Sequence, residues 1–181
     1  MIRYKINSNG FVEVEIPPSI QLLAKQKSET NYINNHKSLE AYGSKRSVDN
    51  NIIGNLGELV FSQLTNLPIL NHIHYDFKTK DGLKIDIKSK GINLEPRGTF
   101  DVSVLEYSAV NQMNDYYVFV RIKKDYSKCW IVGQISKQDF LSKSIKYKAG
   151  DVDTSNNHRF MKDARNMLIK NLEVFNLSDY K

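Results

Sequence analysis

Residues 75–91, YDFKTKDGLKIDIKSKG, alternate polar and apolar side chains on both sides of Asp81-Gly82. Alternation with a period of two residues is typical of a β-strand with one buried face, and Asp-Gly favours the tight turn of a hairpin. We therefore expect a β-hairpin over residues 72–90. A three-residue loop at 80–82 keeps apolar residues opposite one another, whereas a two-residue loop would set apolar residues against polar ones.

This register predicts three directly opposed pairs, which are Phe77 with Ile85, Asp76 with Asp86, and His74 with Lys88. Opposed residues in a hairpin have Cβ atoms about 4.5 to 5.5 Å apart. Two carboxylates at that separation repel each other, and a divalent cation between them reverses the sign of the interaction. Mg²⁺ takes carboxylate and carbonyl oxygens as ligands. The alternation alone leaves two interpretations open, an ordinary solvated hairpin face and a metal site.

Residues 48–65 carry apolar side chains at helical spacing, namely Val48, Ile52, Leu56, Leu59, Val60 and Leu64. Ser47 or Asp49 can cap the start of this helix. Gly54 and Gly57 lie inside it, although each Gly costs up to about 1 kcal/mol relative to Ala. We therefore expect a backbone or a ligand to approach the helix closely at these glycines. Glu58 lies on the polar face, either as a solvated side chain or as part of a site.

The N-terminal region predicts a second hairpin and a second helix. Residues 1–16 alternate around Asn9-Gly10, a dipeptide that favours hairpin turns. Residues 19–42 are expected to be helical, either continuously or with a break near 30–35.

The C-terminal half predicts strands followed by helices. Residues 116–122 and 130–135 are β-rich runs that we expect to pair as a hairpin, and a short apolar run lies at 102–105. Residues 136–139 resemble a capping box that opens a short helix to about residue 145. Residues 158–172 have near-helical apolar spacing and are expected to form a last helix.

This order of elements predicts an α/β or α+β fold, with a central mixed β-sheet flanked by helices. The length of 181 residues suits one domain, 1–181, with a sizeable core. Within it we distinguish an N-terminal hairpin and helix (1–47), a core (48–135) and a C-terminal helical extension (136–181).

Composition narrows the class of protein. The net charge of +6 favours a polyanionic partner, nucleic acid first. The single cysteine, Cys129, excludes an internal disulfide and a Cys-rich zinc site, and its apolar surroundings indicate a buried thiol. No apolar stretch reaches the length of a membrane span, and the N-terminus lacks the apolar core of a signal peptide. We therefore expect a cytoplasmic protein without a membrane partner.

The order of a helix Glu, an Asp, and then Asp-x-Lys on the next strand resembles the PD-(D/E)XK nuclease superfamily. Asp76 matches the acid of the PD element, with Tyr75 in place of Pro. Asp86 and Lys88 match the (D/E)XK element, and Glu58 matches the acidic residue of the preceding helix. The resemblance covers roughly residues 50 to 90 and implies a restriction-endonuclease-like core. An acid-x-Lys triplet also occurs at 179–181, so the triplet carries weight only in this context.

The resemblance implies a Mg²⁺-dependent endonuclease that hydrolyses phosphodiester bonds. DNA is the favoured substrate, and RNA stays open as the alternative. In this interpretation Asp76, Asp86 and the backbone carbonyl of Ile87 hold Mg²⁺, for which Mn²⁺ substitutes. Glu58 would assist through a metal-bound water or a second ion. Lys88 would orient or deprotonate the attacking water, or stabilise charge in the transition state.

Basic residues around the hairpin are candidates for nucleic-acid binding: Lys78, Lys80, Lys84, Lys90 and His74. For His74, a plain surface histidine is the competing interpretation. A second basic region, which either contacts phosphates or is solvated, comprises Lys123, Lys124, Lys128, Lys143, Lys146 and Lys148. Duplex, branched and single-stranded substrates all remain open, and a homodimer would supply the two sites needed to cut both strands.

Two other classes of function compete with the nuclease. One is a catalytically inactive nucleic-acid-binding or assembly protein on the same fold. The other is a basic scaffold or inhibitor protein in which the Asp86-x-Lys88 triplet is incidental.

Overall fold

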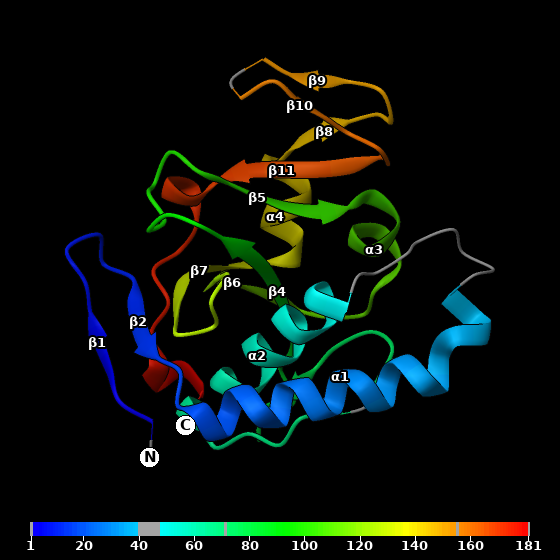
Figure 1. Cartoon of the computed structure of the whole chain (residues 1–181). Coiled ribbons are helices and arrows are strands. Elements are labelled where there is room, and N and C mark those ends of the chain that lie inside the picture. Colours follow the sequence, from blue (N-terminus) through cyan, green and yellow to red (C-terminus); the bar gives the residue numbers. More distant parts are fainter. Residues whose placement is uncertain (1, 40–47, 71, 155, 181) are drawn as a thin grey trace.

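The computed structural model of the protein describes residues 2–39, 48–70, 72–154 and 156–180, with side chains given outside 31–39 and 48. Over these residues the chain is a mixed α/β structure (Figure 1). Its helices are α1 (Pro18–Leu39), α2 (Val48–Thr65), α3 (Glu106–Asn111) and α4 (Lys137–Lys143), with 3₁₀ turns η2 (Ile169–Asn171) and η3 (Leu177–Tyr180). In the described part of the chain, no helix combines the length and the apolar character needed to span a bilayer.

The central sheet has the strand order β1-β2-β7-β6-β4-β3. Its strands are β1 (Tyr4–Ile6), β2 (Val12–Glu15), β3 (Phe77–Lys78), β4 (Lys84–Ile92), β6 (Tyr116–Lys123) and β7 (Lys128–Ser136). β4 and β6 are parallel, and every other neighbouring pair is antiparallel. The mixed central sheet flanked by helices is therefore confirmed.

Smaller sheets lie beyond the central one. β5 (Asp101–Leu105), β11 (Ala164–Leu168) and β8 (Ile145–Tyr147) form a three-stranded sheet, and β9 (Val152–Asp153) pairs with β10 (His158–Arg159). β5 and α3 lie in the crossover that joins the parallel strands β4 and β6. This crossover carries the chain back to the beginning of β4, which matters for the candidate site.

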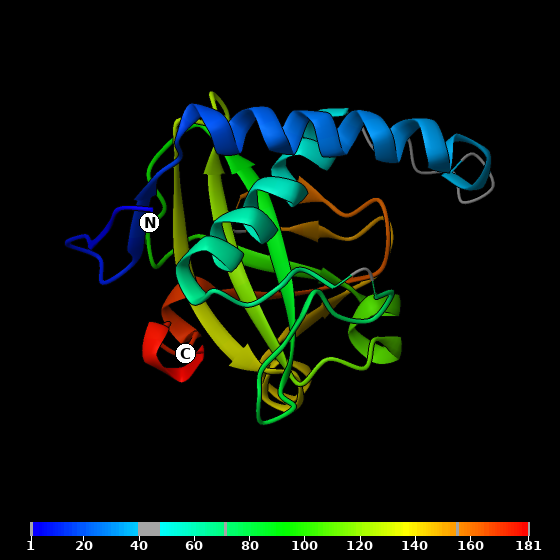
Figure 2. The same cartoon turned by 90° about the horizontal axis from the view of Figure 1, so that it is seen from below.

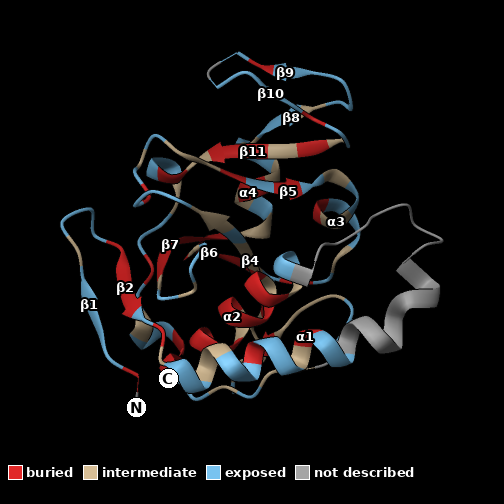
Figure 3. Ribbon diagram, in the orientation of Figure 1, coloured by how far each residue is buried: buried red, intermediate tan, exposed pale blue. Residues whose placement is uncertain are grey.

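Two hydrophobic clusters cover the two faces of the central sheet. α1 and α2 lie together on one face (Figure 2), where Leu56 and Val60 of α2 are fully buried with Val118 and Val120 of β6. The other face packs against α3, α4 and the three-stranded sheet through the second cluster. Figure 3 shows the consequence, since β2, β6, β7 and the inner side of α2 are buried while β1 and the outer side of α1 are exposed.

Several local expectations are confirmed. Residues 48–65 form α2, and β6 pairs with β7 as a hairpin. The Ser136 hydroxyl accepts a 3.0 Å hydrogen bond from the Asp139 backbone N–H and caps α4. β1 pairs with β2, although Gly10 alone of the Asn9-Gly10 pair has a positive φ, 79°. Cys129 is fully buried, and burial raises the pKa of its thiol.

The helix expected over residues 158–172 is wrong, and so is the helical character given to the C-terminal extension beyond α4. These residues form β10, β11 and η2. β11 pairs antiparallel with β5 along its whole length, from Ala164 opposite Leu105 to Leu168 opposite Asp101. Met161, on the apolar face of the expected helix, is 83% exposed. Long-range strand pairing therefore outweighs the local helical spacing.

α1 runs without a break through residues 30–35 to Leu39. The alternative of a helix interrupted there is therefore wrong. The expected end of this helix at residues 40–42 and the Ser47 cap of α2 lie outside the described residues.

Candidate functional site

The hairpin that carries the candidate site has the predicted register near its turn. Phe77 lies opposite Ile85, and the Thr79 backbone N–H donates to the Leu83 carbonyl at 2.9 Å. The three-residue loop 80–82 is therefore confirmed. Gly82 has a φ of 91°, a left-handed conformation that glycine adopts without a steric cost.

The strand β3 begins only after Asp76, because the Asp76 side chain occupies a backbone hydrogen-bonding position of β4. The Asp76 carboxylate oxygen Oδ2 accepts a 2.7 Å hydrogen bond from the Ile87 backbone N–H. A longer β3 would satisfy this N–H with a main-chain carbonyl, so the Asp76 side chain takes the place of a ladder bond. The chain before Asp76 instead curls into a loop that the Leu70 N–H closes on the Asp76 carbonyl at 2.8 Å.

This loop overturns the expected pairing of His74 with Lys88. His74 lies outside β3, and its backbone N–H donates to Nδ1 of His72 at 3.2 Å. The His72 ring stacks on Tyr75 with ring centres 4.1 Å apart. His74 is therefore part of a ring cluster in the 72–75 loop rather than a cross-strand neighbour of Lys88.

The backbone of β4 presents Ile87 to the sheet edge that β3 leaves open. The Ile85 carbonyl accepts from the Asp76 N–H at 2.9 Å, whereas the Lys84 carbonyl bonds on the β6 side to Asp115 N–H at 2.8 Å. Because backbone groups alternate along a strand, the Ile87 carbonyl points to the same edge as the Ile87 N–H. β3 pairs with β4 only at Lys84 and Ile85, so this part of the edge has no strand beside it in the described residues.

Asp86, Lys88 and Gln112 form a connected polar group on one face of β4. Lys88 Nζ lies 2.5 Å from Asp86 Oδ2 and donates to Gln112 Oε1 at 3.2 Å. Gln112 Nε2 in turn donates to Asp86 Oδ1 at 3.4 Å. The Lys88 ammonium also lies 5.7 Å from the centre of the buried Tyr117 ring. These contacts hold Lys88 beside Asp86.

Gln112 is a site residue that the sequence reasoning missed. It follows α3 in the crossover, and the parallel pairing of β4 with β6 brings that segment back to the start of β4. The sequence around Gln112 does not indicate a site residue, because the place of Gln112 depends on the pairing of β6 with β4.

Burial dominates the electrostatics of the two aspartates. Asp86 is 4% exposed. Burial, reinforced by the carboxylates of Asp86 and Glu58, raises the pKa of Asp76 to about 8 from its ordinary 3.8. Burial also raises the pKa of Asp86, against the opposing effect of Lys88. The structure therefore brings Asp76, Asp86 and Glu58 close enough to repel one another electrostatically.

Glu58 is brought to this site by close packing of α2 against β4. A Cβ on Gly57 would overlap the Ser89 hydroxyl and lie 3.3 Å from an Ile87 methyl carbon, so Gly57 confirms the expected close approach. At Gly54 the expected approach of a backbone is wrong, since a Cβ there would meet no atom of the described chain within 4 Å. The Glu58 carboxylate accepts a 2.9 Å hydrogen bond from Lys27 of α1.

The donor set suits a hard divalent cation, although it is not assembled as a finished metal site. Among the described residues, no three His, Cys, Asp or Glu side chains are arranged to hold a metal ion. Lys88 and Lys27 engage Asp86 and Glu58 instead. The buried Asp86 carboxylate, the half-buried Asp76 carboxylate and an outward-facing carbonyl are nevertheless the oxygen ligands that Mg²⁺ prefers. The mutual repulsion of the two carboxylates favours a cation between them.

Lysines differ in their pairing between the two basic regions. In the second region, Lys123, Lys128, Lys143, Lys146 and Lys148 each form an ion pair with an acidic side chain. Around the hairpin, no ion pair within the described part of the chain involves Lys78, Lys80, Lys84 or Lys90. Lys84 instead lies 5.9 Å from the centre of the Tyr75 ring. The hairpin that carries Asp76 and Asp86 therefore holds four lysines without an acidic partner among the described residues, whereas in the second region only Lys124 lacks one there.

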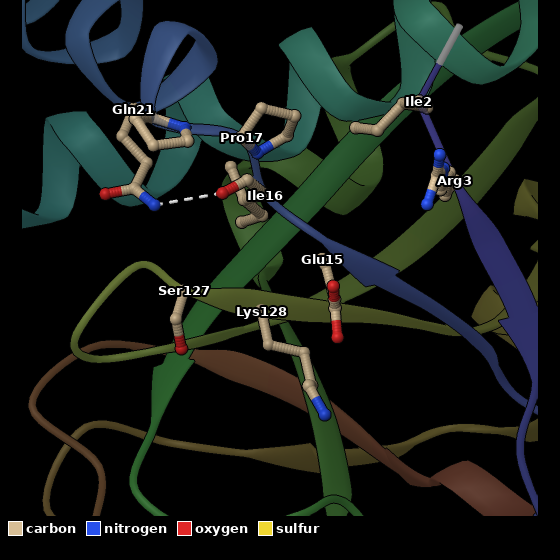
Figure 4. Close-up of a pocket in the computed structure, with 9 residues that line it drawn as sticks. Ile2, Arg3, Glu15, Ile16, Pro17, Gln21, Ser127 and Lys128 are labelled. Carbon is tan, nitrogen blue, oxygen red and sulfur yellow. Dashed lines mark hydrogen bonds between the residues drawn. The ribbon is translucent and has the colours of Figure 1, made fainter.

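A cavity of about 600 Å³ lies elsewhere, between the start of α1 and the start of β7 (Figure 4). It is lined by Arg3, Glu15, Gln21 and Lys128 among others. Strand pairing aligns Cys129, at the start of β7, through Ile122 with Gly91. Gly91 lies five residues after Asp86, roughly 16 Å along the strand at about 3.3 Å per residue. The cavity is therefore distinct from the candidate site.

Comparison of the sequence with protein-family models and with curated proteins gives no match in either case.

Proposed function

We propose that the protein is a divalent-metal-dependent endonuclease that hydrolyses phosphodiester bonds in DNA. The observation that carries the proposal is the meeting of Asp76 and Asp86 at an open strand edge, with Lys88 held beside them. Asp76 directly precedes one strand, and Asp86 lies near the start of the next. Placing a half-buried acid beside a buried one is unfavourable for a folded protein, and this cost favours a functional role for the pair.

The residues divide into three roles in this proposal. Asp76, Asp86 and the Ile87 carbonyl would hold Mg²⁺ or Mn²⁺, with Glu58 assisting from α2. The bound ion would polarise the phosphodiester and lower the pKa of a water molecule. Lys88, fixed by Asp86 and Gln112, would orient that water, take its proton or stabilise the charge that develops on the phosphate oxygens.

The unpaired lysines supply the affinity for the substrate. Each lysine that neutralises a phosphate releases a counterion, which gives binding that weakens with salt and does not depend on sequence. Lys78, Lys84 and Lys90 flank the two aspartates and have no acidic partner among the described residues. They support a nucleic-acid substrate near Asp76 and Asp86.

A cleavage panel tests the proposal. Purified protein is incubated with supercoiled plasmid and with labelled single-stranded, duplex and branched oligonucleotides, in Mg²⁺, in Mn²⁺ and in EDTA. We expect metal-dependent cutting that Asp86→Asn and Lys88→Met abolish. Asp179→Asn, in the acid-x-Lys triplet outside the site, is the matched control and should cut like wild type. Equal cutting by wild type and Asp86→Asn would identify a contaminant and contradict the proposal.

The second candidate is a catalytically inactive nucleic-acid-binding protein on the same fold. The observation that favours it is that Lys88 and Glu58 are already engaged in ion pairs, so the acidic groups have internal counterions. Salt-dependent DNA binding without cutting of any DNA or RNA substrate, in any divalent metal, would select this candidate.

A further inference from the structure

Lys27 and Glu58 join the two helices next to the candidate site. Lys27 Nζ lies 2.9 Å from Glu58 Oε2, and the two side chains are 28% and 23% exposed. The helices are held in register by Asn55, whose side chain donates to the Ser28 hydroxyl at 2.8 Å and to the Ala24 carbonyl at 3.3 Å. These hydrogen bonds fix α1 against α2, so the packing of the helices places Lys27 next to Glu58.

The Lys27 ammonium is a monovalent counterion for a group of acids. Glu58 directly follows Gly57, which packs against Ile87 and Ser89 of β4, so α2 brings the Glu58 carboxylate to the strand that carries Asp86. A divalent cation among these carboxylates attracts Glu58 with twice the charge of Lys27. Binding of the cation would therefore compete with the Lys27–Glu58 ion pair.

Once Glu58 turns to a metal ion, Lys27 needs another anion. A half-buried ammonium without a partner is unfavourable, because it has lost hydration without gaining a hydrogen bond. A substrate phosphate is the anion that the proposed function places nearest. The partly exposed Lys27 side chain is accessible to such a group.

We propose that Lys27 is a phosphate-binding residue that Glu58 holds in reserve, and that metal binding releases it to the nucleic acid. This inference rests on the proposed function. It makes metal and nucleic-acid binding mutually supportive, since coupling between two ligands is reciprocal. Lys27 would therefore strengthen nucleic-acid binding only when the metal ion is bound.

Ca²⁺ and labelled oligonucleotides serve as the probes, in wild type, Lys27→Met, Lys27→Arg and Lys25→Met. Ca²⁺ prefers the same carboxylate oxygens, and a gel confirms that the oligonucleotide stays intact. Lys25→Met is the matched control, because it removes the same charge from the same helix while Lys25 lies 6.0 Å from the centre of the Tyr126 ring. Circular dichroism and thermal unfolding confirm that each variant folds.

Without nucleic acid, titration calorimetry measures Ca²⁺ affinity. We expect Lys27→Met to bind Ca²⁺ more tightly than wild type, because the competing ammonium is gone, and Lys25→Met to bind it like wild type. Unchanged or weaker Ca²⁺ binding by a folded Lys27→Met would overturn the inference.

Fluorescence anisotropy then measures DNA affinity with Ca²⁺ and with EDTA. We expect Ca²⁺ to raise the DNA affinity of wild type at least about fivefold, the lower end of typical coupling. Lys27→Met should lose most of this enhancement and reduce the salt slope by about 0.7 to 0.9. Lys27→Arg and Lys25→Met should keep the enhancement.

For Lys27→Met the two experiments predict opposite changes, a higher affinity for Ca²⁺ and a lower Ca²⁺-dependent affinity for DNA. A variant with a damaged fold would not show this combination. An equal Ca²⁺ enhancement in wild type and Lys27→Met would refute the role of Lys27 while leaving the proposed nuclease intact. A wild-type protein that binds neither Ca²⁺ nor DNA would instead refute the proposed function itself.

Discussion

The half-buried Asp76 carboxylate accepts its 2.7 Å hydrogen bond from the Ile87 backbone N–H while it lies near Asp86 and Glu58. The hydrogen bond favours the ionised carboxylate, but burial and the neighbouring acids favour the protonated one. Burial is the largest effect, and the pKa of Asp76 is raised to about 8. Without a metal ion, this side chain therefore makes the stability of the protein depend on pH.

The metal-free protein should lose stability as the pH rises from about 4 to about 8. In this window Asp76 is ionised in the unfolded chain and protonated in the folded one, given its ordinary pKa of 3.8 and folded pKa of about 8. The folded state binds more protons, so the free energy of unfolding falls with pH by up to about 1.4 kcal/mol per unit. Thermal unfolding in EDTA across this range measures the slope.

Asp76→Asn is the matched variant, because the amide oxygen can still accept from the Ile87 N–H without titrating. In this variant the free energy of unfolding should change little between pH 4 and 8. The loss of stability below about pH 4.5 should remain, because it comes from carboxylates with lowered pKa values, such as Glu13 beside Lys128. An equally steep decline in Asp76→Asn would show that the raised pKa does not belong to Asp76.

Divalent cations should stabilise the protein more at pH 8 than at pH 5.5. At the higher pH the buried carboxylates can ionise, and a cation that binds only the folded state raises the free energy of unfolding. The gain is about 2.7 kcal/mol when the ion is present at 100 times its dissociation constant. The shift in unfolding temperature with Mg²⁺, Mn²⁺ and Ca²⁺ measures it.

Asp86→Asn should abolish this stabilisation, and Asp179→Asn should retain it. A shift of equal size in Asp86→Asn would place the cation at another site.

Gly57 and Gly54 offer a paired test of how α2 sits on β4. Gly57→Ala should destabilise the fold by about 1 to 3 kcal/mol, because the new Cβ would meet the Ser89 hydroxyl and force the helix away from the strand. Gly54→Ala should be neutral or stabilising by up to about 1 kcal/mol, since nothing lies within 4 Å of that Cβ. Urea denaturation measures both, and similar losses in the two variants would contradict the packing.

The sequence predicts what depends on local periodicity and turn chemistry. The 80–82 loop, the Phe77–Ile85 pair and α2 follow from alternation, an Asp-Gly turn and helical spacing. The same reasoning fails at β11, where pairing with the distant strand β5 decides the structure. It also fails at His74, because the Asp76 side chain replaces a ladder bond and ends β3 early.

The acids of the candidate site could be named from the sequence, but the residues that hold them could not. Glu58, Asp76, Asp86 and Lys88 lie on or next to three consecutive elements, α2, β3 and β4, with readable spacing. Their partners arrive from afar, with Lys27 separated from Glu58 by 31 residues and Gln112 from Asp86 by 26. Only the packing of α1 on α2 and the parallel crossover bring these partners into place.

Gln112 should matter for cleavage although it is uncharged. It accepts from Lys88 and donates to Asp86, so its loss frees both groups to move. Removing a hydrogen-bond partner of a metal ligand typically costs about 10- to 100-fold in activity or metal affinity. We expect a loss of this size in the cleavage rate of Gln112→Ala, measured at saturating Mg²⁺.

Asn111→Ala is the control for this effect. Among the described residues, the Asn111 side chain hydrogen-bonds the Tyr107 carbonyl within α3 and no group of the candidate site, so the rate should be unchanged. Full activity of Gln112→Ala would mean that Lys88 is positioned without it.

Lysines with and without acidic partners should differ in their effect on DNA binding. Lys78→Gln with Lys90→Gln should weaken binding for all sequences and lower the salt slope by about 0.7 to 0.9 for each phosphate that is no longer neutralised. Lys146→Gln with Lys148→Gln removes the same charge, but these lysines are paired with Glu106 and Asp163. This control should change the slope little, as measured by anisotropy at salt concentrations from about 50 to about 200 mM. Equal losses in the two double variants would show that binding senses net charge rather than the unpaired lysines beside Asp76 and Asp86.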